Sequence, residues 1–389
     1  MKKGWPTKRL GDVCEIIMGQ SPDGDSYNTT GEGVPLINGP VEFSKESFGE
    51  TIRSKFTTQP TKYCKEGDLI LCVRGSTTGR MNIAGFDACV GRGVAAIRAK
   101  QYQPWINHFI SSKRNEIHGK GLGATFPNVS GGTLANFELI VPPLPEQRRI
   151  VGILDEAFEG IATAKANAEK NLQNARALFD SHLHSVFTHR GDGWVDRKLA
   201  SLCHEITVGH VGPMKSQYKE SGVPFLRSQN IRPFEVSMEN AMFIDQPFHR
   251  ALKKSQLRPG DLAIVRTGYP GTAAVIPAEL PDSNCSDLVI VRPTKELNPH
   301  FLAAFFNSAF GKQLVLGKIV GAAQKHFNIT AAKEVMLHVP PMPVQHAIIA
   351  KIDELREETQ HLESIYRKKL AALEALKKSL LHQAFTGEL

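Results

Sequence analysis

Two stretches of the sequence share one pattern: VPPLPEQRRIVGILDEAF (Val141–Phe158) and VPPMPVQHAIIAKIDEL (Val339–Leu355). In each, two prolines and a third one two residues later precede a run that is typical of a long helix. The first prolines, Pro142 and Pro340, are 198 residues apart. Proline ends a strand or a helix interior, but it fits the first turn of a helix. We therefore interpret each stretch as a joint where a globular module ends and a helix begins.

The rest of the chain repeats on the same plan. KGWPTKRLGDVCEI (from Lys3) resembles DGWVDRKLASLCHEI (from Asp192), and KEGDLILCVRGSTTG (from Lys65) resembles RPGDLAIVRTGYPG (from Arg258). The offset grows from 189 residues near the N-terminus to 198 at the prolines. Such a drift indicates loops of different length inside a shared fold, and not a solenoid of short units.

Short runs rich in Val, Ile and Leu, separated by Gly, Pro, Asn and Asp, predict strands and turns within each module. The sequence thus predicts an α+β fold class, with two similar globular domains joined by two long antiparallel helices in a pseudo-two-fold internal repeat. The expected segments are a first module at 1–143, a helix at 144–188, a second module at 189–341 and a helix at 342–389.

The two helices are expected to begin near Glu146 and Val344 and to form an intramolecular coiled coil. Apolar positions spaced alternately by three and four residues predict a heptad seam in each. The first seam is rich in alanine and the second in leucine, so that small side chains would face large ones. The alternative is that each helix packs only on its own globular core. The predicted seam of the second helix includes Ile352, Leu355, Thr359, Leu362, Lys369 and Leu376.

Composition narrows the class of protein. The 389 residues have a formal net charge of +8 and a pI of about 9.1, which suits a polyanionic partner. No apolar run approaches the ~18–20 residues that a membrane-spanning helix needs. No apolar segment follows the basic N-terminus, so we expect a cytoplasmic protein without membrane association. The six cysteines form no C-x-x-C pair, which argues against a structural zinc site.

Two diverged modules, each closed by Pro-Pro-x-Pro, a glutamine (Gln147 or Gln345) and a long helix, resemble the specificity subunit of a type I restriction–modification system. The C-terminal LLHQAFTGEL (Leu380–Leu389) and its internal counterpart SVFTHRGDGW (Ser185–Trp194) add to a resemblance that covers essentially the whole chain. The second joint departs from the family pattern, because it has Val344 where the first has Glu146.

The resemblance implies a function. Each module would read one half of a bipartite target in double-stranded DNA, and the helices would set the gap and dock two methyltransferase subunits. Restriction (translocase) subunits would join some of these complexes. S-adenosylmethionine, ATP and Mg would bind to the partner subunits, and this chain would bind no cofactor and no metal.

Base-reading loops need hydrogen-bonding side chains, with cations nearby for phosphates. Three places in the repeat fit this description: VRGSTTGRMN with VRTGYPGTAA, HGKGLGATFPNVSG with GKIVGAAQKHFNIT, and FLRSQNIRPF in the second module. The alternatives are plain surface turns and, for the two asparagines, helix N-caps. The candidate DNA-binding residues are Arg74, Ser76, Thr77, Thr78, Arg80, Lys120, Thr125, Asn128, Arg227, Gln229, Asn230, Arg266, Thr267, Tyr269, Gln324, Lys325, His326 and Asn328.

Residues at the joints are candidates for subunit docking, because module, helix and partner could meet there. No phosphate-binding loop with its lysine and no Asn/Asp-Pro-Pro-aromatic tetrapeptide appears, so the chain is not expected to be an enzyme. Two alternatives stay open: a duplicated nucleic-acid-binding adaptor outside restriction–modification, and an enzyme with an unrecognised nuclease or modification site. The candidate docking residues are Glu146, Gln147, Arg148, Arg149 and Gln345.

Overall fold

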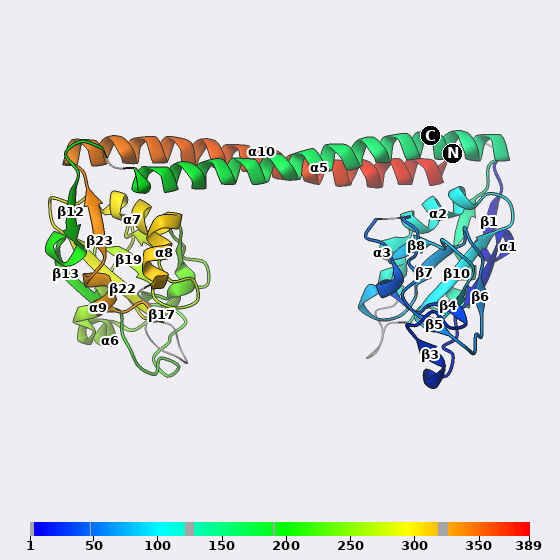
Figure 1. The fold of residues 1–389 in the computed structure, drawn as a ribbon, viewed down its shortest axis with the longest axis horizontal. Coiled ribbons are helices and arrows are strands. Elements are labelled where there is room, and N and C mark those ends of the chain that lie inside the picture. Colours follow the sequence, from blue (N-terminus) through cyan, green and yellow to red (C-terminus); the bar gives the residue numbers. More distant parts are fainter. Residues whose placement is uncertain (1–3, 47, 121–127, 190, 318–325) are drawn as a thin grey trace. The chain divides into compact units, whose positions relative to one another are not determined.

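The computed structural model describes residues 4–46, 48–120, 128–189, 191–317 and 326–389 (Figure 1). The chain divides into two compact units. Unit 1 comprises residues 1–168 and 368–389, and unit 2 comprises residues 169–367. Each unit therefore contains one module together with a portion of both long helices, so the helices do not form domains of their own.

Unit 1 contains two sheets and a short strand pair. The first sheet is antiparallel, with the order β2 (Cys14–Met18), β10 (Val94–Ala99), β7 (Leu69–Cys72) and β8 (Met81–Ile83). The second has the order β3 (Tyr27–Asn28), β5 (Phe56–Thr57), β4 (Val34–Ile37), β9 (Ala88–Val90) and β6 (Tyr63–Cys64). The pair is β1 (Thr7–Arg9) with β11 (Glu138–Ile140). The helices of the module are α1 (Leu10–Val13), α2 (Gln103–Ser112), α3 (Arg114–Lys120) and α4 (Gly131–Ala135).

Unit 2 repeats this arrangement. Its first sheet has the order β13 (Cys203–Val208), β22 (Leu288–Pro293), β19 (Leu262–Val265) and β20 (Ala273–Val275). Its second has the order β17 (Met242–Ile244), β14 (Val223–Leu226), β21 (Ser283–Cys285) and β18 (Gln256–Leu257). Two strand pairs are β12 (Val195–Lys198) with β23 (Met336–Val339), and β15 (Ile231–Arg232) with β16 (Glu235–Val236). The helices are α6 (Gln246–Ala251), α7 (Pro299–Asn307), α8 (Ala309–Gly317) and α9 (Ile329–Lys333).

The two units share details as well as strand order. β4 runs parallel to β9, and β14 runs parallel to β21, while their other neighbours are antiparallel. A buried aspartate directly precedes β7 in unit 1 and β19 in unit 2. It pairs with an arginine of the strand beside it in the sheet, β10 or β22. Arg98 Nη2 lies 2.7 Å from Asp68 Oδ2, and Arg292 Nε lies 3.2 Å from Asp261 Oδ2. The internal repeat predicted from sequence is therefore present in the fold.

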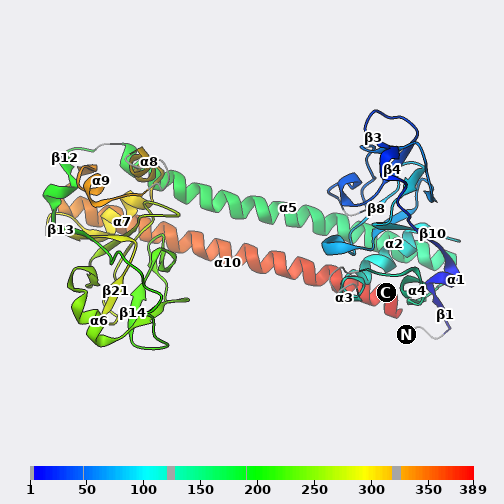
Figure 2. The same cartoon turned by 90° about the horizontal axis from the view of Figure 1, so that it is seen from below.

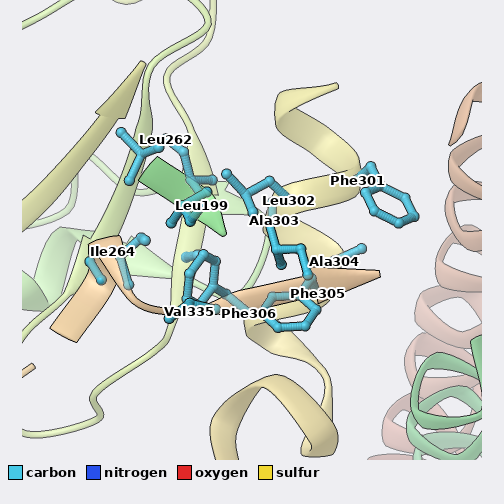
Figure 3. Close-up of a cluster of buried hydrophobic side chains, with 14 of the residues drawn as sticks. Leu199, Leu262, Ile264, Phe301, Leu302, Ala303, Ala304, Phe305, Phe306 and Val335 are labelled. Atoms are coloured by element: carbon cyan, nitrogen blue, oxygen red, sulfur yellow. The ribbon is translucent and has the colours of Figure 1, made fainter. Parts of the chain in front are cut away.

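In unit 2, α7 lies between the first sheet and the long helices (Figure 3). Phe301 and Phe305 point from α7 towards these helices, where their rings lie 5.3 and 5.5 Å from that of Phe187. Leu302 and Phe306 point the other way and are fully buried against the strands. In unit 1, Phe385 occupies the corresponding place, 4.6 Å from the ring of Trp105. The C-terminal end of each long helix therefore packs on a module through a phenylalanine.

The long helices are α5 (Leu144–Thr188) and α10 (Met342–Thr386). They begin where the predicted helix segments begin, two residues before Glu146 and Val344. Lys165 Nζ lies 2.9 Å from Glu374 Oε1 in unit 1, and Arg176 Nε lies 2.9 Å from Glu363 Oε1 in unit 2. Eleven residues forward along α5 thus correspond to eleven residues back along α10, which is an antiparallel register. None of the helices in the described ranges is long and apolar enough to cross a membrane.

The predicted seam of α5 is buried at Ile150, Leu154, Ile161, Ala168 and Ala175, but two of its other positions, Asn171 and Leu178, are exposed. The predicted seam of α10 is wrong in part. Ile352 is buried as predicted, but Leu362 and Leu376 are 40% and 48% exposed. The neighbouring residue, Glu363, makes the contact between the two helices instead, because its carboxylate pairs with Arg176 of α5. The apolar heptad pattern did not distinguish these exposed leucines from core positions.

Candidate nucleic-acid interface

In unit 1, strand ends from both sheets meet at one edge. β2, β4, β7 and β9 end there, and β10 begins there. The backbone N–H of Val73 donates to Gly93 O (3.0 Å), and that of Gly91 donates to Ile37 O (2.8 Å). These bonds hold the loops after β2, β4, β7 and β9 side by side. We call these four loops the loop edge of unit 1.

The loop edge presents amides and cations on closely packed backbone. Gln20, Arg74 and Arg92 are exposed there, and Asn38 is half-buried. A Cβ on Gly91 would lie 2.1 Å from Asn38 Oδ1, so a larger residue at position 91 would require the Asn38 side chain to move. Amides and guanidinium groups are the side chains that pair bidentately with adenine and guanine. The edge therefore has the chemistry of base and phosphate recognition.

The hairpin loop between β7 and β8 separates the predicted residues into two groups. Arg74 and Ser76 are exposed, Thr77 and Arg80 are half-buried, and Arg80 lines a hollow beside α3. Thr78 is only 4% exposed, and its hydroxyl donates to Gly75 O at 2.8 Å. The prediction that Thr78 contacts DNA is therefore wrong, because its side chain closes the turn.

The second candidate segment of unit 1 joins the loop edge at one residue. Asn128 is exposed and forms a backbone bridge with Arg74. Lys120 ends α3, where it pairs with Glu116 at 3.2 Å and lies 4.6 Å from the centre of the Phe137 ring. Thr125 lies outside the described residues.

Unit 2 has an equivalent loop edge, formed by the loops after β13, β14, β19 and β21. The backbone N–H of His210 donates to Cys285 O (2.7 Å), and that of Ser286 donates to Leu226 O (3.0 Å). The topology of the edge is the same as in unit 1, but its side chains differ. Arg227 corresponds to Asn38, since each directly follows its strand. The two edges therefore offer different donors in one geometry.

A buried polar group fixes the first loop residue after β4 and β14. Glu42 Oε2 accepts from the N–H of Asn38 (3.2 Å), and Asn230 Oδ1 accepts from the N–H of Arg227 (3.0 Å). Asn230 is fully buried, and its amide also donates to Ser237 O (3.0 Å). The predicted DNA contact of Asn230 is wrong, because its polar atoms all serve the loop.

Two neighbours of Asn230 point outward. Gln229 is exposed and Arg227 is half-buried, and both donate to Asn240 O, at 3.4 and 3.0 Å. The Arg227 guanidinium also lies 6.0 Å from the centre of the Tyr218 ring. Stacking and a shared carbonyl orient these side chains while leaving further N–H donors for a ligand.

The β19–β20 hairpin loop corresponds to the β7–β8 hairpin loop. The structure aligns the two loops one residue differently from the sequence, which pairs Arg266 with Arg74. Phe327 N–H donates to Arg266 O as Val129 N–H donates to Val73 O, so Thr267 corresponds to Arg74. The Arg266 side chain is only 16% exposed and lies 3.8 Å from Asp287. Arg266 therefore does not match Arg74 as an exposed cation. Thr267 is half-buried, and Tyr269 at the loop tip is 84% exposed.

In the segment before α9, the structure supports the alternative that an asparagine is a helix N-cap. Asn328 is the N-cap of α9, because its Oδ1 accepts from Ala331 N–H at 2.8 Å. Ser130 has the same role in α4 through Thr133 N–H. The capping interpretation thus holds for Asn328 and not for Asn128. His326 is half-buried beside Phe327, and the predicted Gln324 and Lys325 lie outside the described residues.

The joint residues serve the joint itself. Gln147 is 2% exposed and donates to Pro142 O (2.8 Å). Gln345 is fully buried, donates to Pro340 O (2.9 Å) and accepts from Asn298 N–H (2.8 Å). The docking role predicted for both glutamines is wrong, because their amides are enclosed and fasten each helix start to its module.

The three charged joint residues are more accessible. Arg149 Nε lies 2.7 Å from Glu146 Oε2, and its Nη2 donates to Leu389 O at 3.1 Å. The pKa of Arg149 is raised, chiefly by its hydrogen bond to Glu146. Arg148 is exposed and lies 6.0 Å from the centre of the Tyr102 ring.

The described residues contain no group of three or more metal-ligating side chains. Burial raises the pKa of Cys64 and of Cys72 to about 11 and that of Cys14 to about 12. These thiols stay protonated near neutral pH, so they lack the thiolate that a nucleophile needs.

Sequence reasoning missed three residues of the loop edges. Arg92 lies between two glycines in VGRGV, where β9 turns into β10. Gln20 and His210 follow the glycines that end β2 and β13. The signal that was available is a polar residue beside a glycine at the end of an apolar strand. Two repeated units that each present such an edge have the side-chain chemistry expected of a duplicated nucleic-acid recognition protein.

Comparison with known proteins agrees with this class. Residues 2–173 match the family described as "Type I restriction modification DNA specificity domain". The chain is 31% identical over 177 residues to the putative type I restriction enzyme MjaX specificity subunit of Methanocaldococcus jannaschii, an alignment that spans 44% of this chain and 40% of that protein. It is 24% identical over 330 residues to the EcoKI specificity subunit of Escherichia coli K12, covering 78% of this chain and 70% of that one.

A solved structure shares the fold over the full length. It is described as "Structural basis underlying complex assembly and conformational transition of the type I R-M system", and it matches with a TM-score of 0.83 at 20% identity, covering 100% of this chain and 99% of that chain. In sequence the chain is therefore similar to specificity subunits of type I restriction–modification systems, and it shares its fold with a solved type I R-M structure.

Proposed function

We propose that each unit reads one half of a bipartite sequence in double-stranded DNA. The observation that supports this proposal most is the pair of loop edges. The same four strand ends meet in both units, but Asn38, Arg74 and Arg92 are presented in unit 1. Arg227, Gln229 and Tyr269 are presented in unit 2. One geometry with two sets of donors would select two different base sequences.

The side chains available at the edges suit direct readout. Arginine pairs bidentately with guanine, and asparagine or glutamine pairs with adenine. Arg74, Arg92 and Arg227 would supply guanine or phosphate contacts, and Gln20, Asn38 and Gln229 would supply adenine contacts. The net charge of +8 favours the polyanion at any sequence.

We infer that the long helices dock two copies of a methyltransferase subunit. Leu178 of α5 and Leu376 of α10 are 198 residues apart, so they are equivalent in the repeat, and they are 68% and 48% exposed. Each unit thus offers an exposed leucine at the same place on its helix pair. Equivalent apolar positions suit two identical partners better than one.

In such a complex the methyltransferase subunits would bind S-adenosylmethionine and transfer the methyl group. A restriction subunit, where one joins, would bind ATP and Mg. This chain would contribute recognition and no catalytic group. Its place of work would be the cytoplasm, where chromosomal and incoming DNA are found.

Selection from random DNA tests the reading function. The full chain, assembled with its methyltransferase subunits, is incubated with a random duplex pool, and the bound fraction is sequenced over several rounds. We expect two short conserved blocks separated by a gap of fixed length and free sequence. A single contiguous block, or no enrichment, would contradict two independent reading units.

Docking has its own test. Leu178→Glu and Leu376→Glu are each expected to remove about one methyltransferase subunit from the purified complex, measured by mass photometry. Lys170→Gln is the control, because Lys170 is an exposed residue of α5 whose loss removes a charge but no apolar surface. Unchanged stoichiometry in both leucine variants would exclude these positions as docking sites.

A further inference from the structure

Unit 1 contains two adjoining polar hollows beside α3. The first, of about 170 Å³, lies between the β7–β8 hairpin loop and α3 and is lined by Arg80 and Lys45. The second, of about 670 Å³, lies between α3 and the end of α10 and is lined by Lys377 and Lys378. Ser111 and Arg114 line both hollows, so the two form one continuous surface. Figure 2 shows α3 near the C-terminal end of α10. We call it the α3 groove.

The α3 groove is basic, and several of its cations are uncommitted. Within the described part of the chain, Arg80, Arg114 and Lys378 have no ion pair. Other groups that line it are already engaged. Lys113 lies 3.2 Å from Glu116, Glu374 lies 2.9 Å from Lys165, and Lys377 lies 4.9 Å from the centre of the Phe158 ring. The remaining acids of the lining are Glu46 and Glu138, together with one exposed histidine, His382.

The groove begins at the loop edge of unit 1. Arg80 belongs to the same hairpin loop as Arg74, and Arg80 O accepts from Cys72 N–H at 2.8 Å. Gly79 has a positive φ of 90°, and a Cβ there would lie 3.2 Å from Arg114 O, so glycine lets the loop pack on α3. Cations thus continue from the candidate reading loops to the long helix.

Unit 2 lacks these charges at equivalent positions. Thr272 O accepts from Val265 N–H as Arg80 O accepts from Cys72 N–H. Ala309 is the first residue of α8, as Arg114 is the first residue of α3. Asp180 is equivalent to Lys378 in the repeat, because the two are 198 residues apart. The groove is therefore a property of unit 1 and not a by-product of the shared fold.

We propose that the α3 groove binds phosphates of the DNA backbone without regard to sequence, next to the bases that unit 1 reads. This inference rests on the proposed function. Arg80, Arg114 and Lys378 would each neutralise a phosphate and release condensed counterions. The arrangement would make unit 1 the stronger electrostatic anchor of the two units and would stabilise specific and non-specific complexes alike.

Salt dependence of binding tests the proposal. Arg114→Gln, Lys378→Gln and the double variant are compared with wild type in the assembled complex, on the selected target duplex and on an unrelated duplex. Each substitution is expected to lower the slope of log K against log salt by about one and to weaken binding to both duplexes by the same factor. Lys170→Gln is the matched control, because it removes one exposed positive charge from a long helix outside the groove.

Three outcomes would overturn the inference. One is an unchanged slope in the double variant while wild type binds and discriminates normally, which leaves the proposed function intact. Another is a loss confined to the target duplex, which would make these residues base readers. A third is unchanged DNA binding with lost methyltransferase subunits, which would assign the groove to a protein partner. A wild-type complex that does not discriminate between the duplexes would instead contradict the proposed function. As a folding control, the variants should have the same unfolding midpoint as wild type.

Discussion

At the scale of single residues, the polar side chains near the loop edges have two different tasks. Asn230 and Thr78 are buried and hold the backbone of their loops, whereas Arg227 and Arg74 extend from those loops. Sequence alone did not separate the two groups, because each pair lies within one short polar stretch. Burial and hydrogen-bond partners separate them at once.

This division predicts opposite outcomes for two neighbouring substitutions. Asn230→Ala leaves the N–H of Arg227 and the carbonyl of Ser237 without partners, so we expect the free energy of unfolding to fall by about 1–3 kcal/mol. Arg227→Gln should leave stability within about 0.5 kcal/mol of wild type and weaken binding to the selected target. Urea unfolding and fluorescence anisotropy measure the two effects. Equal loss of stability in both variants would contradict the assignment.

A buried histidine predicts a dependence on pH. His108 of α2 is 3% exposed, and burial lowers its pKa against the opposing effect of Asp155 Oδ1, which lies 2.8 Å from its Nε2. Lys377 lowers the pKa further. The unfolded chain therefore binds a proton more readily than the folded one below about pH 6.5.

The free energy of unfolding should accordingly decrease as the pH falls below about 6.5 and stop decreasing once the folded histidine is protonated as well. Urea unfolding of wild type and of His108→Gln between pH 5 and 8 measures this contribution. The variant should show a flatter profile over that window. Parallel profiles would mean that His108 does not contribute.

At the scale of elements, the helices depend on anchors that periodicity does not reveal. The joints and the starts of α5 and α10 could be predicted to within two residues, because proline rules apply to any chain. The seam of α10 could not be predicted throughout, because at this level Glu363 contacts α5 through Arg176 while Leu362 is exposed. The loop edges could not be predicted either, because they depend on which strands are neighbours in the sheets, and the sequence pattern does not show this.

The anchoring of α5 on unit 2 predicts a large cost for one substitution. Phe187 is 3% exposed between Phe301 and Phe305 of α7, so Phe187→Ala should destabilise unit 2 by about 3–5 kcal/mol. Hydrogen exchange should show faster exchange of the α7 amides. Leu178→Ala is the control, since Leu178 is 68% exposed on the same helix and should change little. Unaltered protection of α7 in the Phe187 variant would contradict an anchoring role.

At the scale of the whole chain, duplication explains why one polypeptide has two loop edges with different chemistry. The repeat keeps the strand order of the first sheet, the order of four strands of the second sheet, to which unit 1 adds β3, and the buried Asp–Arg pair. The loops between strands differ in length and in side chains. A protein that reads two half-sites needs the same scaffold twice and different readers on each copy. The basic α3 groove adds a further difference between the units.

The central claim is tested most directly by a genome-wide map of modified bases in the host. The map is made with the gene intact, with the gene deleted, and with Arg227→Gln and Gln229→Ala combined in unit 2. We predict one motif of two short blocks around a fixed gap, which disappears on deletion. In the double variant one block should change or relax, while the other block and the gap stay the same. A contiguous motif, a motif that survives deletion, or a change in both blocks would contradict the assignment of one half-site to each unit.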